Sequence, residues 1–356
     1  MAANGLAYGF VQYSHLAAER VSTVGEAAIY AAIEESAAEY NRVATEMVSL
    51  LAQPTTDFKR RHYLAGSGTL QPLDENGEPV PVRPSGYYDV AFPIQGGGTA
   101  FGKNIISEAL MTVAEANRLT VEALKQDKDW MIRHMLAALL DNTTWTFVDP
   151  KQGSLTIQPL ANGDAVTYVK VDGTSAVDTH HLGQAAAISD VANPFPTIYD
   201  ELMEHPSNSG PVVCYVPSAL TATVEALTNF VPVVDPDIAP GIASDRLVAN
   251  STAVRGWGDE VLGKVDKCWI VEARRLPSTH IVAHAIGAGP VLGMRQYPAP
   301  ELQGLFTRNS QPAGNLTKTS FYRYAGFGVQ NRVAAVVMYI GNETYAIPTG
   351  YENPIS

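Results

Sequence analysis

One stretch of the sequence, "QGGGTAFGKN" at residues 95–104, comes within one residue of a nucleotide-binding phosphate loop. That motif needs Gly, four residues, Gly, Lys, and then a Ser or Thr whose hydroxyl coordinates Mg²⁺. Gly97, Gly102 and Lys103 fit the spacing, but Asn104 stands in the last position. A genuine phosphate loop would make the chain a nucleotide-dependent enzyme, so the flanking sequence has to decide.

The flanking sequence disagrees with a phosphate loop. The run "YYDVAFPI" before it contains Asp89 and Pro93, whereas the central parallel strand of such a site is normally apolar throughout. No clean apolar strand ends in an Asp for the metal, because Pro232 breaks "VPVVD". A P-loop nucleotide-binding enzyme is therefore only a minor alternative.

We interpret the motif instead as a glycine hinge between an extended segment and a long helix. The hinge residues are Gly96, Gly97, Gly98 and Gly102. Asn104 is then expected to be the N-cap of the helix that follows.

Histidines offer the next candidate chemistry, metal binding. His280 and His284 have the i, i+4 spacing of helical ligands, but "STHIVAHAIG" is typical of a strand, on which they would lie about 13 Å apart on one face. His180 and His181 are adjacent, on opposite faces or in a turn, and no HExxH motif occurs. We predict solvated or hydrogen-bonded histidines, no metal site and no cofactor.

Nucleophilic catalysis has no sequence support either. Gly-x-Ser-x-Gly is absent, and Cys214 and Cys268 lie in apolar strand-like runs, where a cysteine is usually a small buried hydrophobe. Two cysteines are too few for a disulfide framework or a zinc cluster. We predict no catalytic residues and no enzymatic activity.

Charge and composition narrow the class of partner. The 356 residues carry a net charge of −12, which argues against binding nucleic acid through its phosphates but not against enclosing it. Basic residues cluster once, in "FKRRH", as Lys59, Arg60, Arg61 and His62. No apolar run approaches the ~20 residues of a membrane span, and the first residues lack a signal-peptide pattern, so we expect no membrane partner.

The expected elements follow from periodicity and from turn residues. An arm of about 23 residues precedes a helix from about residue 25 to 51, with Ile29, Ile33 and Tyr40 on its apolar face. "DFKRRHYL" and "YYDVAFPI" are the limbs of a long hairpin, and a helix runs from Asn104 to about Asp141, where Asp127 or Asp129 could cap a break. Strands and two short helices follow, the second capped by Ser218, and long strands close the chain.

This order of elements resembles the major capsid proteins of tailed bacteriophages, the Hong Kong 97 fold. Three passages carry the resemblance: "GPVVCYVPSALTATVEAL", "VLGKVDKCWIVEARRLPSTHIVAHAIGAGPVLGMRQ" and "FYRYAGFGVQNRVAAVVMYIG". They look like the strand, proline and helix that begin the axial domain, the strand, Leu-Pro and strand passage, and the closing peripheral strands. None is diagnostic alone, and the fold class so implied is α+β.

The resemblance implies a domain plan. It comprises an N-terminal arm (1–23), an N-terminal helix (24–56), an E-loop hairpin with the glycine hinge (57–102), a peripheral domain with the spine helix (103–180), an axial domain (181–312), and return strands with a C-terminal tail (313–356). The E-loop would lie over the adjacent subunit, with Lys59, Arg60 and Arg61 as contact candidates facing acidic neighbours. Residues 64–93 contain no lysine, so we expect no isopeptide cross-link from the hairpin.

The function implied is that of a structural shell protein. Hexamers and pentamers would assemble into an icosahedral phage head that encloses double-stranded DNA without sequence-specific contacts. The head would be built in the host cytoplasm, with portal, scaffolding and decoration proteins as further partners. An encapsulin-like nanocompartment shell is the alternative within the fold.

Overall fold

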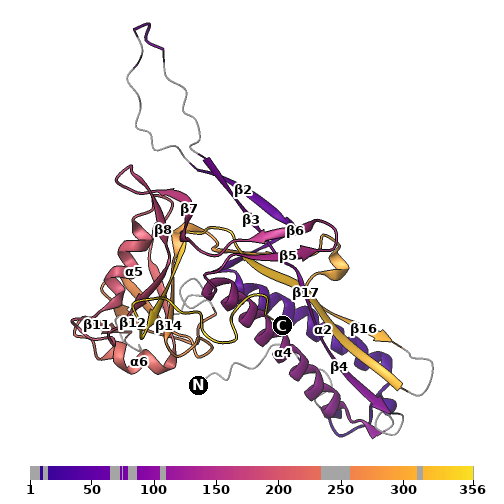
Figure 1. The fold of residues 1–356 in the computed structure, drawn as a ribbon. Helices are drawn as coiled ribbons and strands as arrows, with labels where there is room; N and C mark the ends of the chain where they lie inside the picture. The colour runs from indigo at the N-terminus through magenta and orange to yellow at the C-terminus, as the bar shows by residue number, and fades with distance from the viewer. Residues whose placement is uncertain are drawn as a thin grey trace. The chain divides into compact units, whose positions relative to one another are not determined.

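The computed structural model describes residues 9–10, 15–64, 73, 75–78, 86–104, 110–233, 257–310 and 316–355 (Figure 1). The chain divides into two compact units. The first comprises Met1–Met47, Ile94–Arg133 and Arg295–Gly326, and the second comprises Val48–Pro93, His134–Met294 and Phe327–Ser356. The six-segment domain plan stays a prediction.

Two long helices organise the first unit. Helix α2 (Glu26–Val48) buries Ile29, Ile33 and Tyr40, so the helix and apolar face predicted from the sequence are confirmed. Helix α4 (Val113–Leu140) begins nine residues after Asn104, the predicted start. It is also unbroken, and Asp127 caps no second helix, because its carboxylate is used inside the unit.

The start of the chain lies on these two helices. A four-residue helix, α1 (Val21–Val24), precedes α2, and Val21 N–H donates to Met111 O. Further back, the Phe10 N–H donates to Asn117 Oδ1 of α4 at 2.9 Å, and the Phe10 side chain is buried. The described part of the predicted arm is thus held by contacts with other elements, as an arm without its own core requires.

The predicted glycine hinge is wrong as local structure. Residues Gln95–Asn104 form strand β4, which pairs antiparallel with β17 (Leu316–Val329) from Gln95↔Ala325 to Asn104↔Leu316 (Figure 1). Strand β16 (Leu305–Ser310) pairs with the other edge of β17. Asn104 is therefore a strand residue and not a helix cap, and the phosphate-loop alternative is contradicted because the motif forms no loop.

Aromatic side chains explain the glycines of β4. A Cβ on Gly96 would lie 2.9 Å from the Tyr324 ring, and one on Gly97 would lie 3.1 Å from Trp130 of α4. A Cβ on Gly98 would lie 3.1 Å from the backbone oxygen of Phe321. The strand thus needs residues without a side chain where aromatic rings and backbone approach it closely.

A seven-stranded sheet forms the core of the second unit. Its order is β11 (Phe230–Pro232), β12 (Glu260–Val265), β13 (Cys268–Glu272), β10 (Val212–Val216), β14 (His280–Ala285), β18 (Ala335–Ile340) and β9 (His181–Gln184). Strand β10 is parallel to β13, and β18 is parallel to β9. All five residues of β10 are buried, which is what its uninterrupted apolar run predicts.

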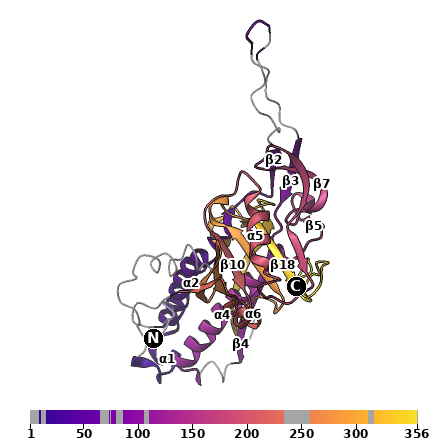
Figure 2. The same cartoon turned by 90° about the vertical axis from the view of Figure 1, so that its left-hand side faces the viewer.

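Two short helices cover one face of this sheet. Helix α5 (Pro194–Met203) packs against β18 and β14 (Figure 2), and Asn193 caps it by accepting the Phe195 N–H. Helix α6 (Ser218–Glu225) has Pro217 at its N-cap, so Ser218 is the first helical residue rather than the predicted cap. Both cysteines are free and buried in this core, as expected from their apolar surroundings.

Smaller strand pairs complete the second unit. They are β1 (Ala52–Thr55) with β15 (Leu292–Arg295), β2 (Lys59–Leu64) with β3 (Gly86–Ala91), β5 (Trp145–Asp149) with β6 (Gly153–Ile157), and β7 (Asn162–Val169) with β8 (Ser175–Thr179). Single-turn 3-10 helices lie at Ile286–Ala288 and Pro300–Leu302, the latter in the first unit. The predicted hairpin limbs are confirmed as β2 and β3, whereas most residues between them lie outside the described residues.

Candidate functional site

The β2–β3 ladder carries the charged residues that the sequence singled out. Cross-strand register places Arg61 opposite Asp89 and Tyr63 opposite Tyr87 on one face. Arg61 Nε lies 2.7 Å from Asp89 Oδ1, and Lys59 Nζ lies 2.7 Å from Asp89 Oδ2. One carboxylate thus serves two cations, which hold its pKa below the usual range although burial opposes them, with the hydrogen bond from Arg61 as the largest cause.

Arg60 points to the opposite face of the ladder. Its Nη2 lies 2.9 Å from Asp57 Oδ2. All three contact candidates therefore have an acidic partner within their own chain. Pairing with acidic groups of another subunit stays a prediction.

An exposed aromatic and arginine patch accompanies the charges. The Arg61 guanidinium lies 3.9 Å from the centroid of the Tyr87 ring, and Tyr63 packs edge-on against Tyr87 with centroids 6.5 Å apart. Tyr63 is 70% exposed and Tyr87 is 56% exposed. Arg and Tyr are the residue types that contribute most to protein interfaces, and this face, which we call the Arg61 patch, has them in contact already.

The reverse face of the ladder is packed against the second unit. Tyr88 stacks on His62 with centroids 5.2 Å apart and meets Tyr168 of β7 edge-on at 6.0 Å. Val90 is fully buried. One face of the hairpin is therefore anchored and the other is free to take a partner, which is the amphipathic pattern that alternation in "YYDVAFPI" predicts.

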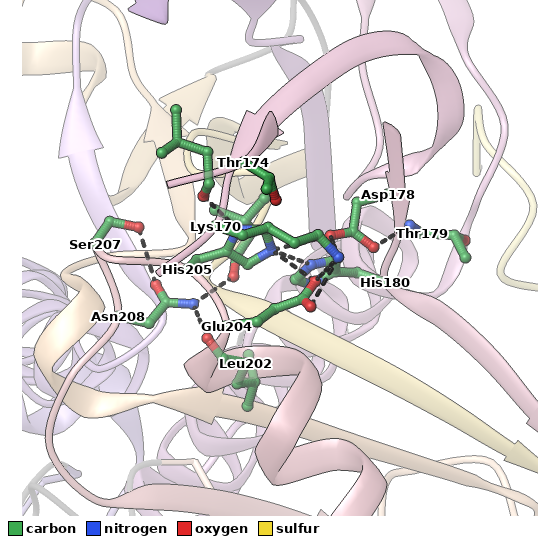
Figure 3. A network of polar contacts seen from close by, with 12 residues as sticks. Lys170, Thr174, Asp178, Thr179, His180, Leu202, Glu204, His205, Ser207 and Asn208 are labelled. Atoms are coloured by element: carbon green, nitrogen blue, oxygen red, sulfur yellow. Dashed lines mark hydrogen bonds and ion pairs between the residues drawn. The ribbon is translucent and has the colours of Figure 1, made fainter. Parts of the chain in front are cut away.

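A second group of residues, the polar cluster, lies around His205 (Figure 3). His180 Nε2 lies 3.1 Å from His205 Nε2, and Asp178 Oδ2 lies 3.2 Å from the same His205 atom. Lys170 Nζ lies 2.7 Å from Glu204 and 3.6 Å from Asp178 Oδ2. Asp178, His180 and His205 are all buried.

The electrostatics of the polar cluster are strongly coupled. Burial lowers the pKa of His180 to about 4, so its ring is neutral near pH 7. Burial would raise the pKa of Asp178, but hydrogen bonds from His205, Glu204 and Glu201 lower it below its usual value. Burial and the hydrogen bond to Asp178 raise the pKa of Glu201 to about 8. Too little positive charge therefore faces too many carboxyl groups.

Sequence reasoning missed the polar cluster. Asp178 ends β8 region residues, His180 lies between β8 and β9, and His205 follows α5, so no local spacing brings them together. The adjacent pair His180 and His181 was the available signal, since His181 turns to Leu139 O at 3.0 Å and leaves His180 for the cluster.

The two histidines of β14 behave differently from each other. His280 Nε2 lies 2.9 Å from Ala346 O and is hydrogen-bonded as predicted. His284 is 1% exposed, and neither of its ring nitrogens has a hydrogen-bond partner among the described residues. The prediction of a solvated or hydrogen-bonded histidine is therefore wrong for His284, because the strand is covered on both faces.

Comparison with known proteins starts without help from sequence. No protein-family model matches the chain, and no curated protein matches it. Its structure, however, is similar to a chain from Mycobacterium phage Patience, with a TM-score of 0.67 and 20% identity over 92% of each chain. The chain has the Hong Kong 97-like capsid fold.

A more distant relative has the same fold. A chain from the capsid of a native GTA particle gives a TM-score of 0.50 and 10% identity, covering 84% of this chain and 90% of that one. The Hong Kong 97-like fold explains why the chain puts residues into a two-stranded ladder that has little core of its own. The fold-level resemblance seen in the sequence is confirmed.

Proposed function

We propose that the protein is a major capsid protein of a tailed bacteriophage. Its subunits assemble through hexamers and pentamers into an icosahedral head that encloses double-stranded DNA. The observation that carries this proposal is the similarity of nearly the whole chain to a phage chain of the same fold. Its role is structural rather than enzymatic.

The β2–β3 ladder supports self-association. Its Arg61 patch exposes two tyrosines and an arginine, whereas the reverse face is anchored through Tyr88 and Val90. A ladder with one bound face and one exposed aromatic face can dock on a neighbouring subunit without reorganising its own fold. Contacts repeated around a ring make even a modest patch effective.

Charge supports a container rather than a DNA-binding protein. A net charge of −12 disfavours adsorption to phosphates, so DNA inside the shell would remain free to pack and to leave. Among the described residues, no helix is both long and apolar enough to cross a membrane. Portal, scaffolding and decoration proteins are the further partners of this function, and assembly takes place in the host cytoplasm.

Sedimentation of the purified protein, with negative-stain images of the fast fraction, tests the proposal. Closed shells, or rings of six and five subunits, are the expected result. Particles purified from infected cells should contain nuclease-protected double-stranded DNA. Shells filled only with cargo protein would favour the nanocompartment alternative, and a monomer under all assembly conditions would contradict both.

A further inference from the structure

The two imidazoles of the polar cluster are both turned so that their lone pairs meet. His180 Nδ1 lies 2.7 Å from Ala335 O, and His205 Nδ1 lies 3.3 Å from Val169 O. A carbonyl oxygen can only accept, so each Nδ1 carries the ring proton and each Nε2 of the neutral rings is an acceptor. These two Nε2 atoms nevertheless lie 3.1 Å apart (Figure 3).

Asp178 adds a third electron-pair donor to the same point. Its Oδ1 accepts the Thr179 N–H at 2.8 Å, but its Oδ2 has no hydrogen-bond partner and lies 3.2 Å from His205 Nε2. Asp178 is 8% exposed, so water does not replace the missing donor. Lys170 is engaged with Glu204 at 2.7 Å and stays 3.6 Å from Asp178 Oδ2.

We propose that Asp178, His180 and His205 bind a divalent transition-metal ion, with Zn²⁺ as the best match. Zinc bonds of about 2.0–2.1 Å to nitrogen and 2.0–2.2 Å to oxygen place tetrahedral ligand atoms about 3.3–3.4 Å apart. The observed separations of 3.1 Å and 3.2 Å are close to that value. This inference does not depend on the proposed capsid function.

The surroundings of the three ligands are those of a metal site. Each histidine donates its Nδ1 proton to a backbone carbonyl, the arrangement that fixes the tautomer of metal-ligating histidines. The backbone is also fixed, because the His180 N–H donates to Ala161 O at 2.7 Å and the Val171 N–H donates to Glu204 O at 2.7 Å. The ligands are therefore positioned before the ion arrives.

A fourth ligand and charge balance are available nearby. Glu204 Oε1 lies 3.8 Å from His205 Nε2, and Glu201 and Glu204 each have a carboxylate oxygen within 4.8 Å of one on Asp178. Three carboxyl groups face the single ammonium of Lys170. A dication supplies the positive charge that this group lacks.

The ion would join three separate segments below the hairpin. Asp178 belongs to β8, His180 to the link between β8 and β9, and His205 to the turn after α5. His205 also packs edge-on against Tyr168 at 6.1 Å, and Tyr168 carries Tyr88 of the hairpin. The metal would thus stiffen the surface on which the β2–β3 ladder rests.

The test uses the full, tag-free chain after treatment with a chelator. Zinc chloride is titrated by calorimetry and cobalt chloride by visible absorption, with thermal unfolding followed in parallel. We expect one saturable ion per chain, the cobalt spectrum of a four-coordinate site, and a higher unfolding midpoint with zinc. The exchanges His205→Asn and Asp178→Asn should weaken zinc binding at least about tenfold, since loss of outer-shell partners alone costs about 10- to 100-fold.

A matched control and a second measurement keep the outcome decisive. His62→Asn removes a histidine of the hairpin, outside the polar cluster, and should leave zinc affinity unchanged. If a cluster variant does not fold, X-ray absorption at the zinc edge of the wild-type protein must show two imidazoles on the metal. No saturable binding, equal binding by all variants, or a first shell without imidazole would overturn the site and indicate that a shared proton holds the two histidines together.

Discussion

Arg323 and Asp127 form a buried ion pair within the first unit, with Arg323 Nε 2.6 Å from Asp127 Oδ1. Their side chains are 4% and 6% exposed. The Tyr40 hydroxyl donates to Asp127 Oδ2 at 2.7 Å, and Arg323 Nη2 donates to Asn41 Oδ1 at 3.1 Å. The pair therefore joins α2 and α4 to β17 through one satisfied polar network.

Removing one member of this pair should be far more costly than removing both. Asp127→Asn leaves the Arg323 guanidinium buried without its counter-ion, and breaking such a pair costs about 3–5 kcal/mol of unfolding free energy. The double exchange Asp127→Leu with Arg323→Met removes both charges and should cost less than the single exchange. Denaturant unfolding of the three proteins measures both quantities.

The surface pair between Arg42 and Glu39 on α2 provides the control, because its Nη2–Oε1 contact of 2.7 Å is exposed to water. Glu39→Gln should change stability much less than Asp127→Asn. Equal losses for these two variants would show that burial does not determine the strength of the Arg323–Asp127 pair.

The glycines of β4 should be intolerant of side chains. In Gly97→Val the new Cβ would start 3.1 Å from the Trp130 ring, so overpacking should cost about 1–3 kcal/mol of unfolding free energy. Ala100→Val adds bulk at an exposed position of the same strand and should be near neutral. Combining Gly97→Val with Trp130→Ala should recover part of the loss, and additive losses would contradict the steric explanation.

The sequence predicts those parts of the fold in which local pattern and tertiary contacts agree. The hairpin limbs alternate because one face is anchored by Tyr88 and Val90, and β10 is apolar throughout because helices and strands cover it. Strand β4 could not be recognised, since three successive glycines show no alternation. The reasons for those glycines, Trp130 and Tyr324, lie far along the chain.

The polar cluster is a harder case for sequence reasoning. Asp178 and His180 are separated from His205 by a strand and a helix, and only the packing of α5 brings them together. Nor can a sequence show that each Nδ1 is occupied by a backbone carbonyl. The ligand set is a property of tertiary structure, so no motif announces it.

The Arg61 patch should affect assembly rather than folding. Arg61→Ala removes the cation over Tyr87 and, under the proposed function, should raise the protein concentration needed for assembly about tenfold, as for an interface hot spot. The unfolding midpoint of the unassembled subunit should hardly change, because Arg61 is exposed. Light scattering during assembly and denaturant unfolding measure the two effects.

Arg42→Ala is the matched control for the Arg61 exchange. Arg42 is also an exposed arginine with acidic partners, Glu39 and Glu46, but no ring contact is seen for it among the described residues. Its loss should leave assembly close to wild type. If both exchanges shift assembly equally, a general charge effect and not the aromatic patch governs association.

His284 should make the protein sensitive to acid. Burial lowers its pKa to about 4, and its ring stacks on Tyr215 with centroids 5.8 Å apart. An unfolded histidine has a pKa near 6.5, so between about pH 6.5 and 4 the unfolded chain binds the proton more readily. Stability contributed by neutral His284 is therefore complete above about pH 6.5 and is lost as the pH falls toward 4, by about 3 kcal/mol in all.

The exchange His284→Phe removes the titrating group while keeping a ring against Tyr215. Between pH 7 and 4 the variant should lose about 3 kcal/mol less unfolding free energy than the wild type, because no proton can bind at this position. It should retain the acid loss that comes from other buried histidines. Denaturant unfolding at several pH values gives both curves, and parallel curves would mean that His284 is protonated in the folded protein or gains access to water.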